Sequence, residues 1–186
     1  MSKRTINSFV NNYDFDKYLK FLDFDHKVLY RQSELEAPGF RIDELFRGKN
    51  YLAVIALKDT RDIAHFVVLR KDSDFKYSYM DCLGEPVPEF LQDLIVGSRS
   101  NEDPKIEVEY TDKRLMALDG IICGKYCLAF AMAGDISLGK WVDILTSSKK
   151  FKPDDIIDNL YRLEYSQTQI TVVNDPTTQA AVSPFL

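Results

Sequence analysis

A cysteine followed by a glycine, Cys123-Gly124, stands between the turn Asp119-Gly120 and an apolar run with helical character. A helix N-terminus presents unpaired backbone N–H groups and the positive end of the helix dipole. A thiolate is favoured there, so the pKa of a thiol can fall by roughly one to several units from about 8.5. The same N–H groups can stabilise an oxyanion on an attacked acyl group. The pattern predicts a nucleophilic Cys123, with Gly120 and Gly124 beside the oxyanion and the substrate backbone.

The alternative is a structural cysteine, because free cysteine is among the most buried residue types. Cys127, one helical turn later among apolar residues, is expected in the core. For Cys82 the sequence leaves open both a core position and a position lining the site. The odd number of cysteines and the lack of a CxxC pattern argue against a disulfide framework and a zinc site. We therefore expect no metal and no cofactor.

Two histidines, His26 and His65, are the candidates for the base that a catalytic thiol needs. His26 lies among charged residues and is expected at the surface. His65 interrupts an apolar strand pattern, where an imidazole needs a hydrogen-bond partner or a place near solvent. A core histidine with its hydrogen bonds satisfied is the alternative for His65.

A hairpin predicted on either side of the polar loop KDSDF supplies a partner for His65. If Arg70 pairs with Lys76, His65 lies directly opposite Asp81 on the same face of the sheet. Directly opposed residues have Cβ atoms about 4.5–5.5 Å apart, which lets a carboxylate orient an imidazole. A slip of one residue would place the two side chains on opposite faces. The alternative for Asp81 is an ordinary strand-end residue that starts the turn to Gly84.

The rest of the sequence predicts an α+β domain with a small, mostly antiparallel sheet and the nucleophile helix packed against it. Strands are expected at 51–57, 63–69, 75–81 and 105–110, and helices at 15–24, from Pro88 to Gly97, between Gly120 and Gly134, and from Pro153 onward. The 186 residues suit a single domain, 1–186, with a tail at 174–186 that shows no periodicity.

Composition narrows the partners and the compartment. The net charge of −5 argues against nucleic acid as the main partner, because phosphate contacts need concentrated Lys and Arg. The N-terminal residues lack the apolar stretch of a signal peptide, and no apolar run reaches membrane-spanning length. With three cysteines that suggest no disulfides, the chain is expected in a reducing compartment.

With His65, Asp81 and Cys123 in that order, the chain resembles the adenain family of adenovirus maturation proteases. It is especially similar to relatives encoded by virophages and virus-like DNA transposons, in a clan that includes the SUMO-deconjugating proteases. The resemblance spans roughly residues 38 to 134. It rests on APGFRIDEL before the first core strand, AHFVVL as the histidine strand, YSYMDCLGEPVP as the acidic strand and its exit, and CGKYCLAF as the nucleophile helix.

The resemblance implies a papain-like cysteine endopeptidase of the adenain/SUMO-protease type that processes capsid and other structural precursors. It would act in the virion and the host cytoplasm. Some relatives are stimulated by a viral peptide activator and by DNA, and the acidic balance of this chain argues against stimulation by DNA. The family usually carries an oxyanion-hole glutamine six or seven residues before the nucleophile, where this chain has Ala117 and Met116. The alternatives are a protease that deconjugates ubiquitin-like proteins and a catalytically inactive virion assembly module of the same fold.

Overall fold

The computed structural model describes residues 24, 26–58, 65–97, 105–117 and 122–160. The tail at 174–186 and nearly all of the helix expected at 15–24 lie outside the described residues. Within the described ranges, no helix has the length and apolar character needed to cross a membrane.

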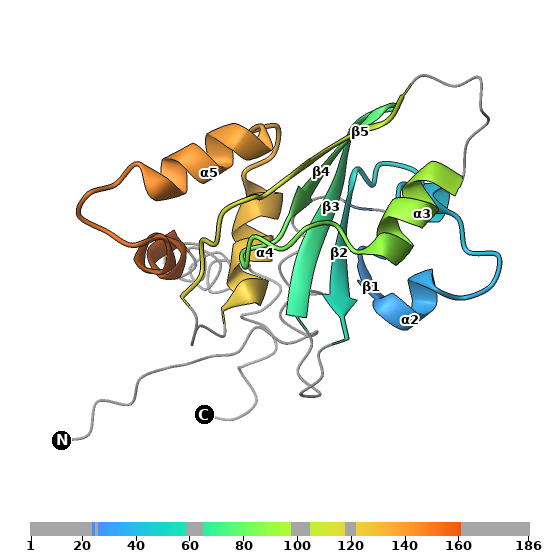
Figure 1. Cartoon of the computed structure of the whole chain (residues 1–186), viewed down its shortest axis with the longest axis horizontal. Coiled ribbons are helices and arrows are strands. Elements are labelled where there is room, and N and C mark those ends of the chain that lie inside the picture. The colour runs from blue at the N-terminus through green and yellow to red at the C-terminus, as the bar shows by residue number, and fades with distance from the viewer. Residues whose placement is uncertain (1–23, 25, 59–64, 98–104, 118–121, 161–186) are drawn as a thin grey trace, which may run out of the picture.

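A five-stranded sheet forms the centre of the molecule, with its strands in the order β1-β2-β3-β4-β5 (Figure 1). The strands are β1 Leu29–Arg31, β2 Leu52–Leu57, β3 His65–Ser73, β4 Lys76–Met80 and β5 Glu107–Tyr110. The two central pairings are antiparallel, as predicted, but β1 with β2 and β4 with β5 are parallel. The sheet is therefore mixed and not mostly antiparallel. The chain passes through a helix between β4 and β5, and such a crossover returns it in the same direction.

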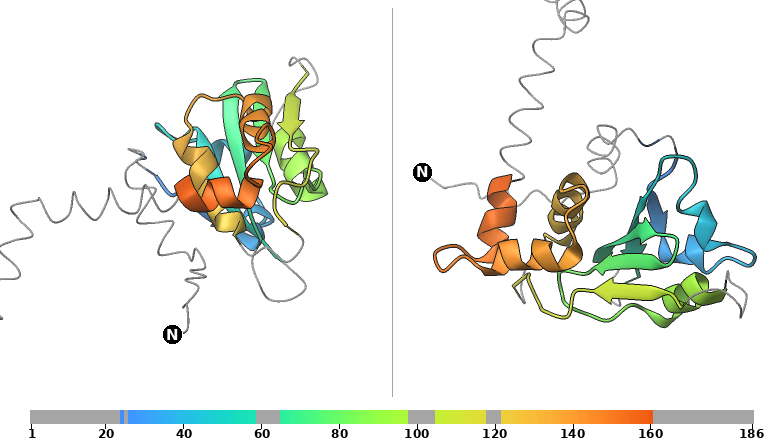
Figure 2. Two further views of the ribbon diagram at one scale, coloured as in Figure 1. Left: turned by 90° about the vertical axis from the view of Figure 1, so that its left-hand side faces the viewer. Right: turned by 90° about the horizontal axis from the view of Figure 1, so that it is seen from above.

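Helices cover both faces of this sheet (Figures 1 and 2). The helical segments are α2 Gln32–Leu35, the 3-10 turn η2 Ile42–Glu44, α3 Glu89–Gly97, α4 Cys123–Met132, α5 Leu138–Thr146 and a last helix at 153–160. α2, η2 and α3 pack over a core that includes Val67, Leu69 and Tyr79. α4, α5 and the helix at 153–160 pack over a second core that includes Val68 and Met80. Successive side chains along β3 and β4 point to opposite faces of the sheet and so pack alternately into these two cores.

The helix signals at proline and glycine are confirmed for α3. It runs from Glu89 to Gly97, and the carbonyl of Pro88 accepts the N–H groups of Leu91 and Gln92 at 3.0 Å. Its apolar residues Leu91 and Ile95 are fully buried. The helix predicted before Gly134 is also confirmed as α4, whereas α5 was not predicted.

β3 and β4 form the predicted hairpin with a different register. Arg70 lies opposite Ser78, two residues beyond the predicted partner Lys76. The register changes at a β-bulge beside Asp72, whose carboxylate accepts hydrogen bonds from Arg70 Nε at 2.7 Å and from Ser78 Oγ at 2.5 Å. The predicted pairing was wrong because the strands continue past the start of KDSDF and meet at a tighter turn.

Candidate active site

α4 begins at Cys123, where the sequence predicts the start of the nucleophile helix. The helix packs against β3, and most of its side chains are buried. Cys123 is only partly buried, whereas Cys127 is fully buried, as predicted for a core residue. The first turn of α4 and the start of β3 lie toward the same end of the sheet (Figure 1). The hydrogen bond between the side chains of Cys123 and His65 places the thiol beside the first residue of β3.

His65 is the first residue of β3, and Asp81 directly follows β4. His65 Nε2 and Asp81 Oδ1 are 2.8 Å apart. The expected contact is present across a diagonal of the hairpin, because the register differs from the predicted one by two residues. A displacement of an even number of residues leaves both side chains on the same face. The Asp81 side chain is 2% exposed and that of His65 16%, so only the imidazole can be reached from solvent. His26 is exposed, as predicted.

The turn after β4 holds the Asp81 carboxylate in place. Its Oδ1 also accepts the N–H of Leu83 at 2.8 Å, and its backbone carbonyl accepts the N–H of Gly84 at 3.0 Å. Gly84 has φ +73°, and a Cβ there would lie 2.6 Å from the carbonyl carbon of Lys113. Only glycine suits such a position. Asp81 therefore starts a turn and binds His65 with the same side chain.

The electrostatics of this pair extend to Cys123. Burial alone would lower the pKa of His65, but hydrogen bonds with Asp81 and Cys123 outweigh it and raise the pKa to about 9. Burial alone would raise the pKa of Cys123, but the hydrogen bond with His65 lowers it below the ordinary value. The backbone N–H groups of Phe66 and Gly124 lower it further. These opposite shifts favour a thiolate–imidazolium pair.

The tautomer of His65 follows from the geometry. Nε2 is engaged with Asp81 Oδ1, which as a carboxylate oxygen only accepts hydrogen bonds. Nε2 therefore carries a proton, and Nδ1 is the nitrogen left to face the sulfur of Cys123. A third group that fixes the imidazole in this way is the arrangement found in nucleophile–base–acid triads.

Only some of the groups expected around an oxyanion lie within the described residues. Gly124 lies in the first turn of α4, and its N–H acts on the sulfur of Cys123, whereas Gly120 lies outside the described residues. Met116 is buried in the core and Ala117 is exposed. Neither residue type carries a side-chain amide. Sequence reasoning missed the N–H of Phe66, which depends on how β3 and α4 meet and has no signal in the sequence.

Cys82 lies in the core and beside the site, so both positions left open by the sequence apply. It is 1% exposed, and its Sγ lies 3.9 Å from Met116 Sδ. Burial raises the pKa of its thiol, which keeps it protonated at neutral pH. Within the described part of the chain, His65, Asp81 and Cys82 bring three possible metal-ligand atoms within 4.8 Å of one another. Since His65 and Asp81 already bind each other, we assign this cluster to the His–Asp pair.

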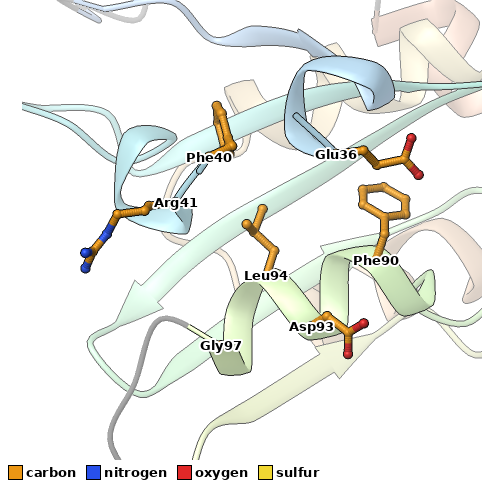
Figure 3. A pocket seen from close by; sticks show the side chains of 7 residues that line it. All are labelled: Glu36, Phe40, Arg41, Phe90, Asp93, Leu94 and Gly97. Carbon is orange, nitrogen blue, oxygen red and sulfur yellow. The ribbon is translucent and has the colours of Figure 1, made fainter. Parts of the chain in front are cut away.

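A groove of about 530 Å³ lies elsewhere on the molecule (Figure 3). It is lined by Glu36, Phe40, Arg41, Phe90, Asp93, Leu94 and Gly97. These residues belong to α3 and to the chain around α2 and η2, whose core lies on the other face of the sheet from α4. The groove is therefore separate from the cysteine site.

Comparison with known proteins adds evidence on the fold. No family model matches the sequence, and no curated protein matches it. The crystal structure of the ASFV pS273R protease matches with a TM-score of 0.55, over 84% of this chain and 67% of that chain, at 11% sequence identity. The match does not single out the adenain or virophage relatives that the sequence resembles. At this identity it shows the fold: this chain shares its fold with the ASFV pS273R protease.

Proposed function

We propose that this chain is a cysteine endopeptidase with Cys123 as nucleophile, His65 as general base and acid, and Asp81 as the residue that orients His65. The observation that carries the proposal is the position of the His65 imidazole. It is hydrogen-bonded to Asp81 at 2.8 Å and to Cys123 at the first turn of α4. The fold shared with the ASFV pS273R protease supports the same reading.

Acylation starts from the ion pair. The Cys123 thiolate attacks the carbonyl carbon of the scissile peptide bond and forms a tetrahedral intermediate. His65 donates its Nδ1 proton to the leaving amine nitrogen, and the C–N bond breaks to leave a thioester on Cys123. Asp81 accepts the Nε2–H bond throughout and stabilises the imidazolium that carries both protons.

Deacylation uses the same groups in reverse. Neutral His65 takes a proton from a water molecule, whose oxygen attacks the thioester carbonyl carbon. The C–S bond then breaks, which releases the acid product and restores the thiolate–imidazolium pair. In both steps, the proposal assigns stabilisation of the negative oxygen to backbone N–H groups at the start of α4, with Gly124 among the residues that would provide them.

The substrates in this proposal are capsid and other structural precursors of the virus that encodes the chain. The basis is the sequence resemblance to adenain-like maturation proteases, including those of virophages, together with the viral origin of the structural match. The site of action is the virion and the host cytoplasm. A reducing compartment suits a catalytic thiol, and Cys82, Cys123 and Cys127 are all free in the structure.

Co-expression with the precursor structural proteins of the same genome tests the proposal. Intact mass spectrometry should show processed products with the wild-type chain and none with Cys123→Ala. Cys127→Ala is the matched control on the same helix: it should keep processing and lose about 1–3 kcal/mol of stability through the cavity. A SUMO-fusion substrate in parallel tests the deconjugating alternative.

Two results would count against the proposal. Processing that persists in Cys123→Ala but stops in Cys127→Ala would assign the nucleophile to the other thiol. A folded wild-type chain that cleaves neither precursor nor fusion substrate would favour the inactive assembly module.

A further inference from the structure

The helix at 153–160 packs beside the nucleophile helix α4 (Figure 2). Ile157 is fully buried in the core that α4 also fills. One turn of this helix faces Lys125, whose ammonium binds Asp158 at 2.7 Å although its side chain is only 8% exposed. The contact fixes the helix at 153–160 along the side of α4.

Asp154, in the first turn of this helix, binds two points of the chain that flank Cys123. Its Oδ1 accepts the hydroxyl of Tyr126 at 2.7 Å, and its Oδ2 accepts the backbone N–H of Ala117 at 3.1 Å. Ala117 stands six residues before Cys123 and Tyr126 three residues after it. One carboxylate therefore joins the segment that leads to the nucleophile and the first turn of the nucleophile helix.

The segment that Asp154 holds is also tied to the strand that carries the acid. The N–H groups of Leu115 and Met116 both donate to the carbonyl of Cys82, at 2.9 and 3.0 Å. The hydroxyl of Tyr126 makes a second contact with the Leu115 carbonyl at 3.3 Å. Residues 115–117 thus connect the exit of β4 to α4. Asp154 adds to this connection by binding both Ala117 and Tyr126.

We propose that Asp154 is a positioning residue for acyl transfer at Cys123, because it binds the backbone before the nucleophile and the side chain of Tyr126 on the nucleophile helix. The inference rests on the proposed function of Cys123 as a nucleophile. Hydrogen-bond donors for an oxyanion act only when they are held in place before the reaction. The Asp154 carboxylate holds Ala117, before the nucleophile, and Tyr126 on α4, the helix whose first turn supplies such donors in the proposed function.

The role is expected in acyl transfer and not in forming the thiolate. The thiolate depends on His65, which is held by Asp81, whereas Asp154 accepts its hydrogen bonds from Ala117 and Tyr126. Removing a nearby negative charge also favours a thiolate. A slower acylation in an Asp154 variant would therefore not come from a loss of thiolate.

Two small probes separate these steps and need no knowledge of the cleavage motif. With p-nitrophenyl acetate, the Cys123 sulfur attacks the ester carbonyl through an oxyanion, the C–O bond breaks, and p-nitrophenolate leaves with the electron pair. Water then hydrolyses the thioester to acetate. With iodoacetamide, the sulfur displaces iodide from carbon and forms no oxyanion. The ratio of the two rates at one pH reports on the oxyanion step alone.

Asp154→Asn and the near-isosteric Tyr126→Phe should each lower the rate of the p-nitrophenolate burst by about 10- to 100-fold, the scale of an ångström-sized misplacement. Alkylation of Cys123 by iodoacetamide should stay within about threefold of wild type. The matched control is Asp158→Asn, which removes the negative charge that pairs with Lys125 between the same two helices and leaves Asp154 in place. It should lower the unfolding midpoint and leave the ratio of the two rates unchanged.

The outcomes separate this inference from the proposed function. A wild-type chain that is alkylated but never acylated would refute the protease, and the role of Asp154 with it. If the wild-type chain is acylated, and both variants are acylated as fast as the wild type, the role of Asp154 alone would be refuted. Equal losses of acylation and alkylation in Asp154→Asn and Tyr126→Phe would also overturn it, since they would show a general disturbance of Cys123 and His65.

Discussion

At the scale of single residues, Asp81 supplies more than a contact to the imidazole. Its Oδ1 accepts from both His65 Nε2 and the N–H of Leu83, and its side chain is 2% exposed. The Leu83 N–H needs a side-chain acceptor from position 81, in a variant as in the wild type. An asparagine there would keep its carbonyl oxygen toward Leu83 and His65, so the main loss would be the negative charge.

Asp81→Asn should therefore lower kcat/KM less than the roughly 10⁴-fold known for the matching change in a serine protease triad, by about 10²- to 10³-fold. In the proposed mechanism the Cys123 thiolate is formed in advance and needs less help from the acid. Steady-state kinetics on a cleaved precursor peptide measure the loss. A kcat/KM within about twofold of wild type would remove Asp81 from the mechanism.

The pKa shifts of the pair predict a fall in activity on the alkaline side. His65 must be protonated to donate to the leaving amine, and its pKa is raised to about 9. kcat/KM should hold up to pH 8 and fall as pH rises through about 9. Iodoacetamide needs only the thiolate, so alkylation of Cys123 should not fall there. Because the pKa of Cys123 is lowered, alkylation should also extend to lower pH than for an ordinary thiol, whose pKa is about 8.5.

His65→Gln is the matched test of this assignment. It removes the imidazolium that lowers the pKa of Cys123, so the midpoint of alkylation should move to higher pH. The measurement is the alkylation rate across pH, followed by intact mass. An unchanged midpoint would show that the start of α4, and not His65, activates the thiol.

At this scale the sequence predicted the residues that depart from their local pattern. Cys123 stands at a helix start, His65 breaks an apolar strand, and Asp81 ends one, so each is visible without a structure. The N–H of Phe66 and the carboxylate of Asp154 could not be predicted, because each acts on a residue distant in the chain. The two aspartates after Pro153 indicated only a helix start.

At the scale of elements, the sequence of α5 carries a helix pattern, although this helix was not predicted. Its buried residues Leu138, Trp141, Val142 and Leu145 follow the i, i+3, i+4, i+7 spacing of an amphipathic helix. Ser137 caps it by accepting the N–H of Lys140. β1 is different, because it has three residues and pairs in parallel with a strand more than twenty residues away. No local pattern marks such a pairing.

The packing of residues 115–117 determines the effect of introducing a glutamine at position 116 or 117, where the resembled family carries its oxyanion-hole glutamine. Met116 is 5% exposed and its sulfur contacts Cys82, so Met116→Gln places an amide in the core. We expect a loss of about 1–3 kcal/mol of unfolding free energy and no gain in turnover. Ala117→Gln is the matched variant at an exposed position, with stability within about 0.5 kcal/mol of wild type and at most a modest gain.

Urea unfolding and p-nitrophenyl acetate turnover measure both variants. Met116→Gln with full stability and faster turnover would contradict the buried position of Met116. It would also show that the side chain at 116 can turn toward the thiol.

At the scale of the whole molecule, one sheet serves two cores. α3 covers one face and α4 with α5 covers the other, while β3 and β4 send alternate side chains into each. Arg70 strengthens the second face: its side chain lies over the ring of Phe130 and donates to the carbonyl of Gly134, just beyond α4. Because the central strands belong to both cores, we expect the two faces to unfold together.

Trp141, the single tryptophan, reports on this cooperativity because it packs on Phe130 in the core of α4 and α5. Leu91→Ala empties a fully buried site in the other core, under α3, and should cost about 2–5 kcal/mol. If the two faces unfold as one unit, the urea midpoint of Trp141 fluorescence should fall by the same amount as the far-UV circular dichroism midpoint. Leu145→Ala, also fully buried but on the Trp141 side, is the matched control. A Leu91→Ala transition that moves in circular dichroism alone would show that the α3 face unfolds by itself, and the single-domain prediction for residues 1–186 would then be wrong.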